Sequence, residues 1–333
     1  MRTFDKPAID VPSQIELLKQ RGLLIQDEAR AQCFLQSVSF FRLSPYMRPF
    51  QQSGDVDHRF RDGTGFRQLT RLYDFDRRLR LLSMDAIERV EIATRSMISN
   101  HMGPNYGSHW YTDIGMFQQA FDHQRLLATL QSKQCAAIRD YERECLRIDR
   151  LQADSGRKAH LKCQRAKESY ARHYPTTYDQ PPLMPGWAML EELTLGDLSH
   201  LYKGLARDSD KKAIARRLEL PAPLMQSWLH TLTTIRNICA HHARMWNREL
   251  GIRPELPKKA NFPWPRHLLH PGTHTRMFAA LCILNHLMHK VCPHAHWDRR
   301  LHQLTEEFPD VSLKAMGFPQ DWYQDPFWHP VRA

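Results

Sequence analysis

The sequence predicts an all-α fold, and three observations support this prediction. Apolar residues recur at helical spacing over most of the 333 residues. Long alternating runs of β-branched residues, which a sheet would need, do not occur in the sequence. The hydrophobic share is 42% and the charged share 25%, which is typical of a folded globular chain rather than of a disordered or low-complexity one.

Residues 1–62 are predicted to form a small helical module. Two short amphipathic segments, Ser13–Arg21 and Asp27–Val38, are separated by a turn at Gly22. A pair of this kind resembles a helix-turn-helix and could contact nucleic acid. Short helices more often simply pack against a main domain, so both interpretations stay open.

Residues 63–250 are predicted to form the helical core. It begins with a long helix from Phe66 to about His101, which we expect to end at Gly103-Pro104. The remaining predicted helices cover residues 117–149, 157–170, 187–206, 211–218 and 223–247. Residues 139–172 carry ten Lys or Arg against six Asp or Glu. This net charge of +4 suits a phosphate backbone, although it is also ordinary for a solvated helix face.

The composition changes after Gly251. Ten of the 21 prolines lie there, together with four tryptophans, and residues 273–291 form the one strong helical pattern. The tryptophans are Trp264, Trp297, Trp322 and Trp328. We expect this Pro/Trp-rich extension, residues 251–333, to wrap the core rather than to form a domain of its own.

The charge of the chain favours a nucleic-acid partner. Lys plus Arg exceed Asp plus Glu by 47 − 36 = 11, and 34 of the 47 cations are Arg. Arginine can grip two phosphate oxygens at once and can stack on bases. A basic protein without any polyanionic partner is the alternative.

No membrane span or secretion signal is predicted. The longest apolar run, about residues 277–288, is shorter than the roughly 20 residues that cross a bilayer. The N-terminus lacks the apolar core of a signal peptide, and seven irregularly spaced cysteines cannot all be paired. We therefore expect a reduced, cytoplasmic protein.

The segment RNICAHHARMWNR, residues 236–248, carries the candidate site. If the predicted helix continues to Asn247, six polar or cationic side chains share an arc of about 140° at 100° per residue. They are Arg236, Asn237, His241, Arg244, Asn247 and Arg248. The remaining positions are mostly apolar, so one side of this helix is expected to be buried and the other exposed.

These residue types suit metal-independent cleavage of RNA. The ribose 2′-hydroxyl must lose a proton, the phosphorane must be neutralised, and the departing 5′-oxygen must gain a proton. Histidine in general suits the proton steps and arginine suits the charge. We predict that His241 transfers protons, that Arg236 holds the scissile phosphate and that Asn237 orients the reacting groups. Further RNA contacts are expected from His242, Arg244, Asn247 and Arg248.

The spacing Arg-x4-His alone carries little information, because 19 × 34/333 gives about two such pairs by chance. The fuller string does carry information, and it resembles the Abi-like abortive-infection proteins of bacteria (AbiD/AbiF type), which are placed in the HEPN ribonuclease superfamily. Other strings share this resemblance across nearly the whole chain. They include IELLKQRGLL at 15–24, FFRLSPY at 40–46, LYDFDRRLR at 72–80, IERVEIATR at 87–95 and GFP at 317–319.

The resemblance implies a HEPN-type helical bundle and a role in phage defence. It also implies a motif at Arg236, Asn237 and His241, metal-independent RNA cleavage, and homodimers in which two motifs form one composite site. The superfamily suggests tRNA or a non-coding RNA as the target, and no cofactor is expected. Ala243 stands where related toxins controlled by a nucleotidyltransferase often have tyrosine, so control by modification of that residue is not expected.

Several alternatives remain open. A non-cleaving RNA-binding defence or regulatory protein would use the same basic surfaces. A helical scaffold that binds only proteins would not bind RNA at these surfaces. Arg236 and His241 could also form a polar seam between packed helices. The Cys/His-rich segment from Cys282 to His296 invites a zinc site, but its spacing does not match one, and we expect no metal there.

Overall fold

The computed structural model describes residues 3, 7–258, 262–269 and 273–329. Within these residues the chain forms thirteen α-helices joined by loops and 3-10 turns, without a β-strand, which confirms the predicted all-α class. The helices are α1 Val11–Gln20, α2 Glu28–Val38, α3 Phe40–Met47, α4 Phe66–Tyr106, α5 His123–Asp149, α6 Ser155–Lys167, α7 Tyr170–Thr177, α8 Gly186–Glu191, α9 Leu195–Gly204, α10 Asp208–Arg216, α11 Ala222–Ala240, α12 Met277–Val291 and α13 Trp297–Glu307.

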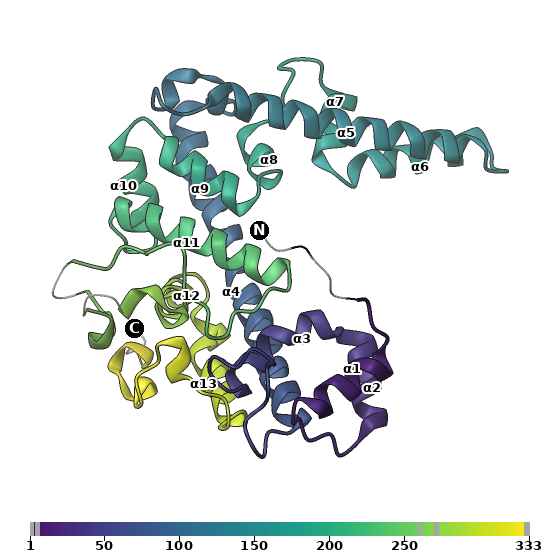
Figure 1. The fold of residues 1–333 in the computed structure, drawn as a ribbon. Helices are drawn as coiled ribbons and strands as arrows, with labels where there is room; N and C mark the ends of the chain where they lie inside the picture. The colour runs from purple at the N-terminus through teal and green to yellow at the C-terminus, as the bar shows by residue number, and fades with distance from the viewer. Residues whose placement is uncertain (1–2, 4–6, 259–261, 270–272, 330–333) are drawn as a thin grey trace.

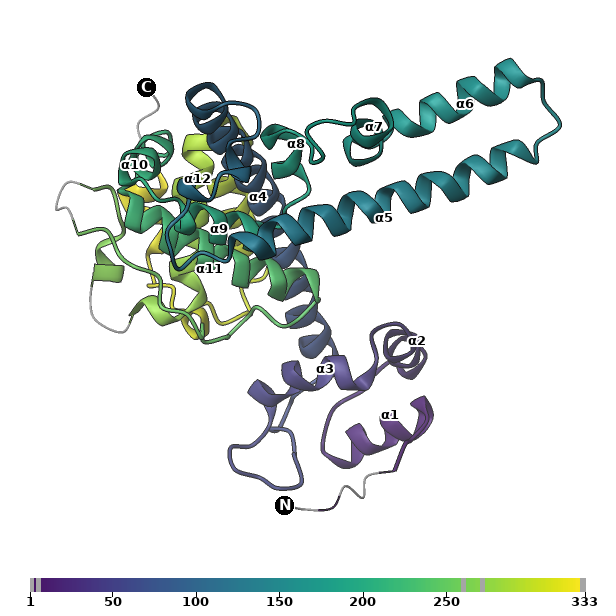
Figure 2. The ribbon, with the colours of Figure 1, turned by 90° about the horizontal axis from the view of Figure 1, so that it is seen from above.

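Helix α4 is the central element of the fold (Figures 1 and 2). It is 41 residues long, and α3, α8, α10, α11, α12 and α13 all pack against it. Its end at Tyr106 lies beyond the predicted end at His101, because Pro104 falls in the last turn. Pro104 has no N–H to donate within the helix, and the helix ends two residues after it. Gly107 then ends the helix with a φ of +91°, a conformation that glycine adopts without strain.

The single helix predicted for residues 187–206 is wrong, because the chain forms two helices there. α8 ends at Glu191 and α9 begins at Leu195. Thr194 starts the second helix with a capping box, in which its hydroxyl accepts from Asp197 N–H and the Asp197 carboxylate accepts from Thr194 N–H. The break lets α9 pack along α11.

Residues 131–177, here called the arm, project from the body as a helical hairpin (Figures 1 and 2). α5 ends at Asp149, where the sequence predicted its end. The predicted helix 157–170 divides into α6 and α7, and Asp154 caps the start of α6. The helices of the arm pack chiefly against one another.

The N-terminal module contains three helices rather than two. α1 and α2 match the predicted pair, and α3 follows directly from Ser39, whose hydroxyl accepts from Arg42 N–H at 3.3 Å. α3 packs against the first turns of α4. This contact places the module next to the end of α11, because Arg42 also donates to the His242 carbonyl at 2.7 Å.

The C-terminal segment packs along the body. α12 is buried over nearly its whole length and lies against α4 and α11. Beyond it, the Trp297 indole donates to the Leu82 carbonyl at 3.0 Å, and Arg71 of α4 pairs with Asp310 at 2.8 Å. Residues 259–261, 270–272 and 330–333 of the predicted extension lie outside the described residues. The division at residues 62 and 250 remains a prediction.

Candidate functional site

Helix α11 presents one face to the core and another to solvent. Pro221 is its N-cap and Pro223 lies in its first turn, positions that suit the fixed φ of proline. The apolar face packs against α4, α9, α10 and α12. Its buried residues include Leu224, Met225, Trp228, Leu229, Leu232, Ile235, Ile238 and Cys239. On the opposite face His230 and Asn237 are exposed.

α11 ends at Ala240, not at the predicted Asn247. His242 N–H donates to the Cys239 carbonyl at 3.0 Å, and Ala243 N–H donates to the Ile238 carbonyl at 2.9 Å. These two bonds form a Schellman motif, in which the residue at the position of His242 adopts a positive φ. The φ of His242 is +53°. Glycine usually occupies this position, and its absence hides the helix end in the sequence.

A buried carboxylate on α4 holds the chain beyond α11. Asp76, which is 0% exposed, accepts hydrogen bonds from Met245 N–H at 3.0 Å and from Trp246 N–H at 2.5 Å. It also accepts from the Tyr46 hydroxyl at 2.5 Å and pairs with Arg80. Desolvation raises the pKa of Asp76, while Arg80, Tyr46 and the two amides oppose that rise by stabilising the carboxylate. Tertiary contacts therefore set the course of residues 243–246.

Arg236, Asn237 and His241, which we call the motif, lie at the last turns and the C-cap of α11. Asn237 and His241 are exposed, and Arg236 is half-buried. The Arg236 guanidinium donates to Asn237 Oδ1 at 3.4 Å, and His241 N–H donates to the Asn237 carbonyl at 3.0 Å. Five residues at 1.5 Å each separate Arg236 from His241 by about 7.5 Å along the axis. All three side chains are thus carried by one helical segment.

The predicted arc of six side chains on one helix is wrong. Arg244, Asn247 and Arg248 follow the end of α11, and the side chain of each forms a hydrogen bond within the protein. Arg244 is half-buried and donates to the Pro45 carbonyl at 3.1 Å. Asn247 Oδ1 accepts from Arg276 at 3.3 Å, and Arg248 donates to the Arg244 carbonyl at 3.4 Å. These residues do not continue the exposed face of α11.

Three guanidinium groups surround the end of α11. Arg42 donates to the His242 carbonyl, Arg80 lies 3.5 Å from the Ala243 carbonyl, and Arg244 reaches the Pro45 carbonyl. Cations are favoured at the C-terminus of a helix, where the backbone carbonyls carry partial negative charge. Burial lowers the pKa of Arg244, and the nearby Asp76 carboxylate opposes this. Because Asp76 pairs with Arg80, the net positive charge near His241 and His242 comes from Arg42 and Arg244.

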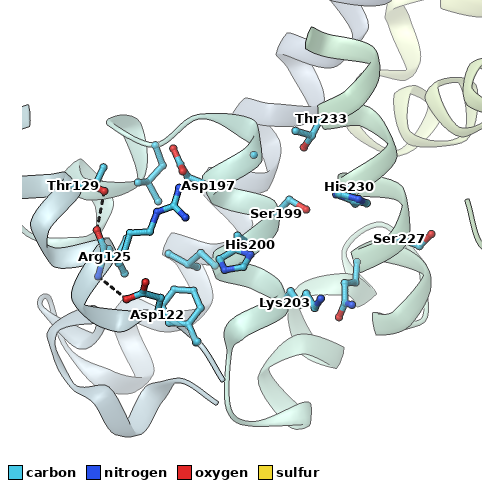
Figure 3. Close-up of a pocket in the computed structure, with 16 residues that line it drawn as sticks. Asp122, Arg125, Thr129, Asp197, Ser199, His200, Lys203, Ser227, His230 and Thr233 are labelled. Atoms are coloured by element: carbon cyan, nitrogen blue, oxygen red, sulfur yellow. Dashed lines mark hydrogen bonds between the residues drawn. The ribbon is translucent and has the colours of Figure 1, made fainter. Parts of the chain in front are cut away.

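A groove of about 480 Å³ lies farther along α11, between this helix, α5 and α9. Figure 3 shows polar side chains from the three helices around one space. The cations are Arg125 and Lys203, the imidazoles are His200 and His230, and the carboxylates are Asp122 and Asp197. No local sequence pattern predicts this groove, because its residues come from three separate segments of the chain.

The Cys/His-rich segment does not form a metal site in the structure. Among the described residues, no group of three or more His, Cys, Asp or Glu side chains is placed to hold a metal ion. Cys282 and His286 lie buried in α12. The His286 ring packs on Phe262 and Trp228, with centroid distances of 5.0 and 5.3 Å.

Comparison with known proteins identifies the family of this chain. A family model described as Abi-like protein matches residues 33–247, more than half of the chain. The chain belongs to the Abi-like family. The matched region of this Abi-like chain contains the motif, Asp76 and the whole groove. Neither a curated protein nor a solved structure matches it.

The described residues of this Abi-like protein include no helix that is both long and apolar enough to cross a membrane. The residues missed by the sequence analysis also include the network around Asp76. One signal could have revealed it: Asp76 follows Leu72 by four positions and precedes Leu79 by three, so it interrupts an apolar stripe. A carboxylate in such a position needs buried partners.

Proposed function

We propose that this Abi-like protein is an endoribonuclease that acts in phage defence by abortive infection and cleaves RNA by attack of a 2′-hydroxyl. The observation that carries the proposal is the joint location of Arg236, Asn237 and His241 at the accessible end of one helix. The Asp76 carboxylate accepts hydrogen bonds from the backbone that follows α11. The side chains of Arg42, Arg80 and Arg244 lie around the end of this helix. This combination suits a negatively charged substrate and proton transfer.

The proposed reaction needs no group beyond side chains and substrate. A base removes the proton of the 2′-hydroxyl, and the 2′-oxygen attacks the adjacent phosphorus. The bond between phosphorus and the 5′-oxygen then breaks, and that oxygen takes up a proton. The products are a 2′,3′-cyclic phosphate and a 5′-hydroxyl. His241 carries out proton transfer, and Arg236 neutralises the charge that grows on the phosphoryl oxygens.

Asn237 orients these groups. Its Oδ1 accepts from the Arg236 guanidinium, which leaves its Nδ2 with two hydrogens for a phosphate oxygen or for the substrate ribose. Arginine held in this way loses less freedom when it binds phosphate. The Asn237 carboxamide thus couples the position of Arg236 to the substrate.

A second copy of the chain supplies the second proton-transfer group in this proposal. One imidazole cannot be base and acid at once, whereas two motifs in a homodimer provide both. Two exposed apolar side chains adjoin, in sequence, arginines that contact the end of α11, and they are available for such contact. Phe41, next to Arg42, is 87% exposed, and Leu81, next to Arg80, is 57% exposed. Contact with a second copy would remove both apolar side chains from water.

The test is cleavage of total RNA and of synthetic oligonucleotides in buffer with EDTA. The wild type should produce 2′,3′-cyclic phosphate ends, and His241→Ala should lower the rate by about 100-fold to 10,000-fold, the contribution typical of general acid-base catalysis. His160→Ala is the matched control, because His160 is an exposed histidine on α6, in the arm. Its rate should equal that of the wild type.

Two outcomes would contradict the proposal. Equal cleavage by wild type and His241→Ala would move the chemistry elsewhere or assign it to a contaminant. Phage protection and RNA binding that survive in His241→Ala, without cleavage by the wild type, would favour the non-cleaving RNA-binding protein.

A further inference from the structure

We propose that the groove between α5, α9 and α11 binds one nucleotide of single-stranded RNA, a few positions away from the scissile phosphate. This inference rests on the proposed function and extends it to a substrate contact outside the motif.

The cations of the groove are free for an anionic ligand. The side chains of Arg125 and Lys203 line the groove, and neither has a hydrogen-bond or ion-pair partner within the described chain. Both carboxylates are engaged in capping helices. Asp122 accepts from Arg125 N–H at 2.9 Å, and Asp197 accepts from the amide and the hydroxyl of Thr194 at 3.0 and 2.7 Å. The groove therefore offers phosphate two cations that form no ion pair, although two capping carboxylates, which keep their charge, line it as well.

The groove also offers a surface for a base. The His200 ring packs on the Phe121 ring with a centroid distance of 5.5 Å and an angle of 32°. Phe121 in turn stacks on Phe117 at 4.5 Å, and it touches Gly204 so closely that an added Cβ would lie 2.2 Å from its ring. This wall is thus rigid, while His200 itself is exposed. Aromatic rings of this kind stack on the bases of single strands.

The size of the groove favours a single strand. A volume of about 480 Å³ is in the range that accommodates one small organic ligand, such as a nucleotide. The bases of an A-form duplex are paired with one another and face the helix interior, so they cannot enter a groove of this size. We therefore assign the groove to an unpaired nucleotide.

The position of the groove connects it to the motif. His230, Asn237 and His241 follow one another at seven and four residues, which places them within about 40° on the surface of α11. His230 lies in the groove, and all three are exposed. The axial separation of His230 and Asn237 is about 10 Å, which corresponds to about two or three phosphate spacings along a strand. One strand can therefore contact both places.

The experiment measures RNA binding in the His241→Ala protein, which keeps the RNA intact. The probe is a fluorescein-labelled, single-stranded octanucleotide, and the readout is anisotropy over a range of NaCl concentrations. The double variant Arg125→Glu/Lys203→Glu should bind about tenfold or more weakly. The slope of log affinity against log salt should shrink by about 1.4, because each phosphate contact on a single strand contributes about 0.7.

The matched control is Lys212→Glu/Arg217→Glu, which reverses two exposed cations on and next to α10 that do not line the groove. It should weaken binding by less than about twofold. Arg125→Lys/Lys203→Arg keeps both charges and should retain most of the affinity. A thermal melt of each variant shows that it is folded. The same octanucleotide annealed as a duplex should show little difference between the groove variant and the control.

The outcomes separate this inference from the proposed function. If the wild type cleaves RNA but the groove variant binds as well as the control, the groove assignment is wrong and the ribonuclease proposal stands. If the groove variant loses binding but the wild type does not cleave, the groove assignment stands and the catalytic proposal fails. If neither protein binds the octanucleotide, the groove assignment is overturned, and cleavage of total RNA by the wild type decides the ribonuclease proposal separately. A duplex bound as strongly as the single strand, with the same dependence on Arg125 and Lys203, also overturns the assignment.

Discussion

The end of α11 and the arm use the same kinds of charged residue in opposite ways. At the end of α11, Asp76 and Arg80 form an ion pair that is almost completely removed from water, with side-chain exposures of 0% and 6%. In the arm, Glu144 pairs with Arg172 at 3.2 Å, where the two side chains are 30% and 16% exposed. Buried charges must be satisfied by several partners, whereas exposed ones are also solvated by water.

This difference indicates where precise geometry is maintained. Asp76 receives two amides, a hydroxyl and a guanidinium, so the chain next to the motif has one well-defined path. The arm instead exposes large apolar residues, Leu146 at 60% and Leu151 at 48%, and its helices chiefly contact one another. The proposed chemistry is thus located in the rigid region of the molecule.

Substitution of the buried carboxylate should have the largest effect on stability. Asp76→Ala leaves Arg80 and two amides without their partner, and removal of one member of a buried pair costs about 3 to 5 kcal/mol. Urea unfolding of wild type and variant measures this free energy. A loss below about 1 kcal/mol would mean that water replaces the carboxylate and that the end of α11 is less tightly held than its contacts imply.

The second prediction concerns pH and the buried imidazole of the body. Burial lowers the pKa of His286 to about 4, compared with about 6.5 in an unfolded chain. The unfolded state therefore binds an additional proton as the pH falls below 6.5. Titration of His286 therefore leaves the free energy of unfolding unchanged above pH 6.5. It lowers that free energy between pH 6.5 and about 4, by about 3 kcal/mol in total.

His286→Gln isolates this contribution, because glutamine can still donate to the Leu218 carbonyl but does not titrate. The difference in unfolding free energy between wild type and variant should shrink as the pH falls from 7.5 to 4.5. A difference that does not change with pH would show that folding does not lower the pKa of His286.

The comparison also explains which features could be predicted from the sequence. The end of α5 at Asp149 was predicted correctly from local periodicity, although the predicted helix 157–170 of the same arm divides into α6 and α7. The end of α11 was predicted incorrectly, because residues 241–247 contain no glycine or proline to end a helix. The Asp76 carboxylate, about 170 positions away in the chain, redirects the backbone at Met245 and Trp246.

The candidate site divides in the same way. Arg236, Asn237 and His241 are close in sequence, so one helical segment carries them and a linear pattern was enough to propose them. The predicted positions of Arg244 and Arg248 on the exposed face were wrong, because only tertiary contacts define where α11 ends. The groove depends on Arg125, Lys203 and His230, which come from three helices, so no local pattern could have assembled it.

The third prediction tests whether the arm unfolds separately from the body. Ile148 is 8% exposed and lies near the far end of α5. Ile148→Ala should cost about 2 kcal/mol, near the low end for a buried aliphatic residue, because few core residues surround it. Hydrogen exchange should show faster exchange in α6 and the end of α5, while amides of α4 and α11 keep their protection. Faster exchange throughout the body would instead show that the arm and the body unfold as one cooperative unit.

The smallest effect is expected from the ion pairs of the arm. Glu144→Ala removes the partner of Arg172 at 3.2 Å and of Arg165 at 3.7 Å. Partly exposed pairs of this kind contribute about 0 to 1 kcal/mol, and salt screens them. The loss in unfolding free energy should therefore stay below about 1 kcal/mol and should shrink further in 0.5 M NaCl, in contrast to Asp76→Ala, whose effect should persist there. If Glu144→Ala costs as much as Asp76→Ala, water does not solvate the carboxylates of the arm more effectively than that of Asp76, and the contrast between the two regions is lost.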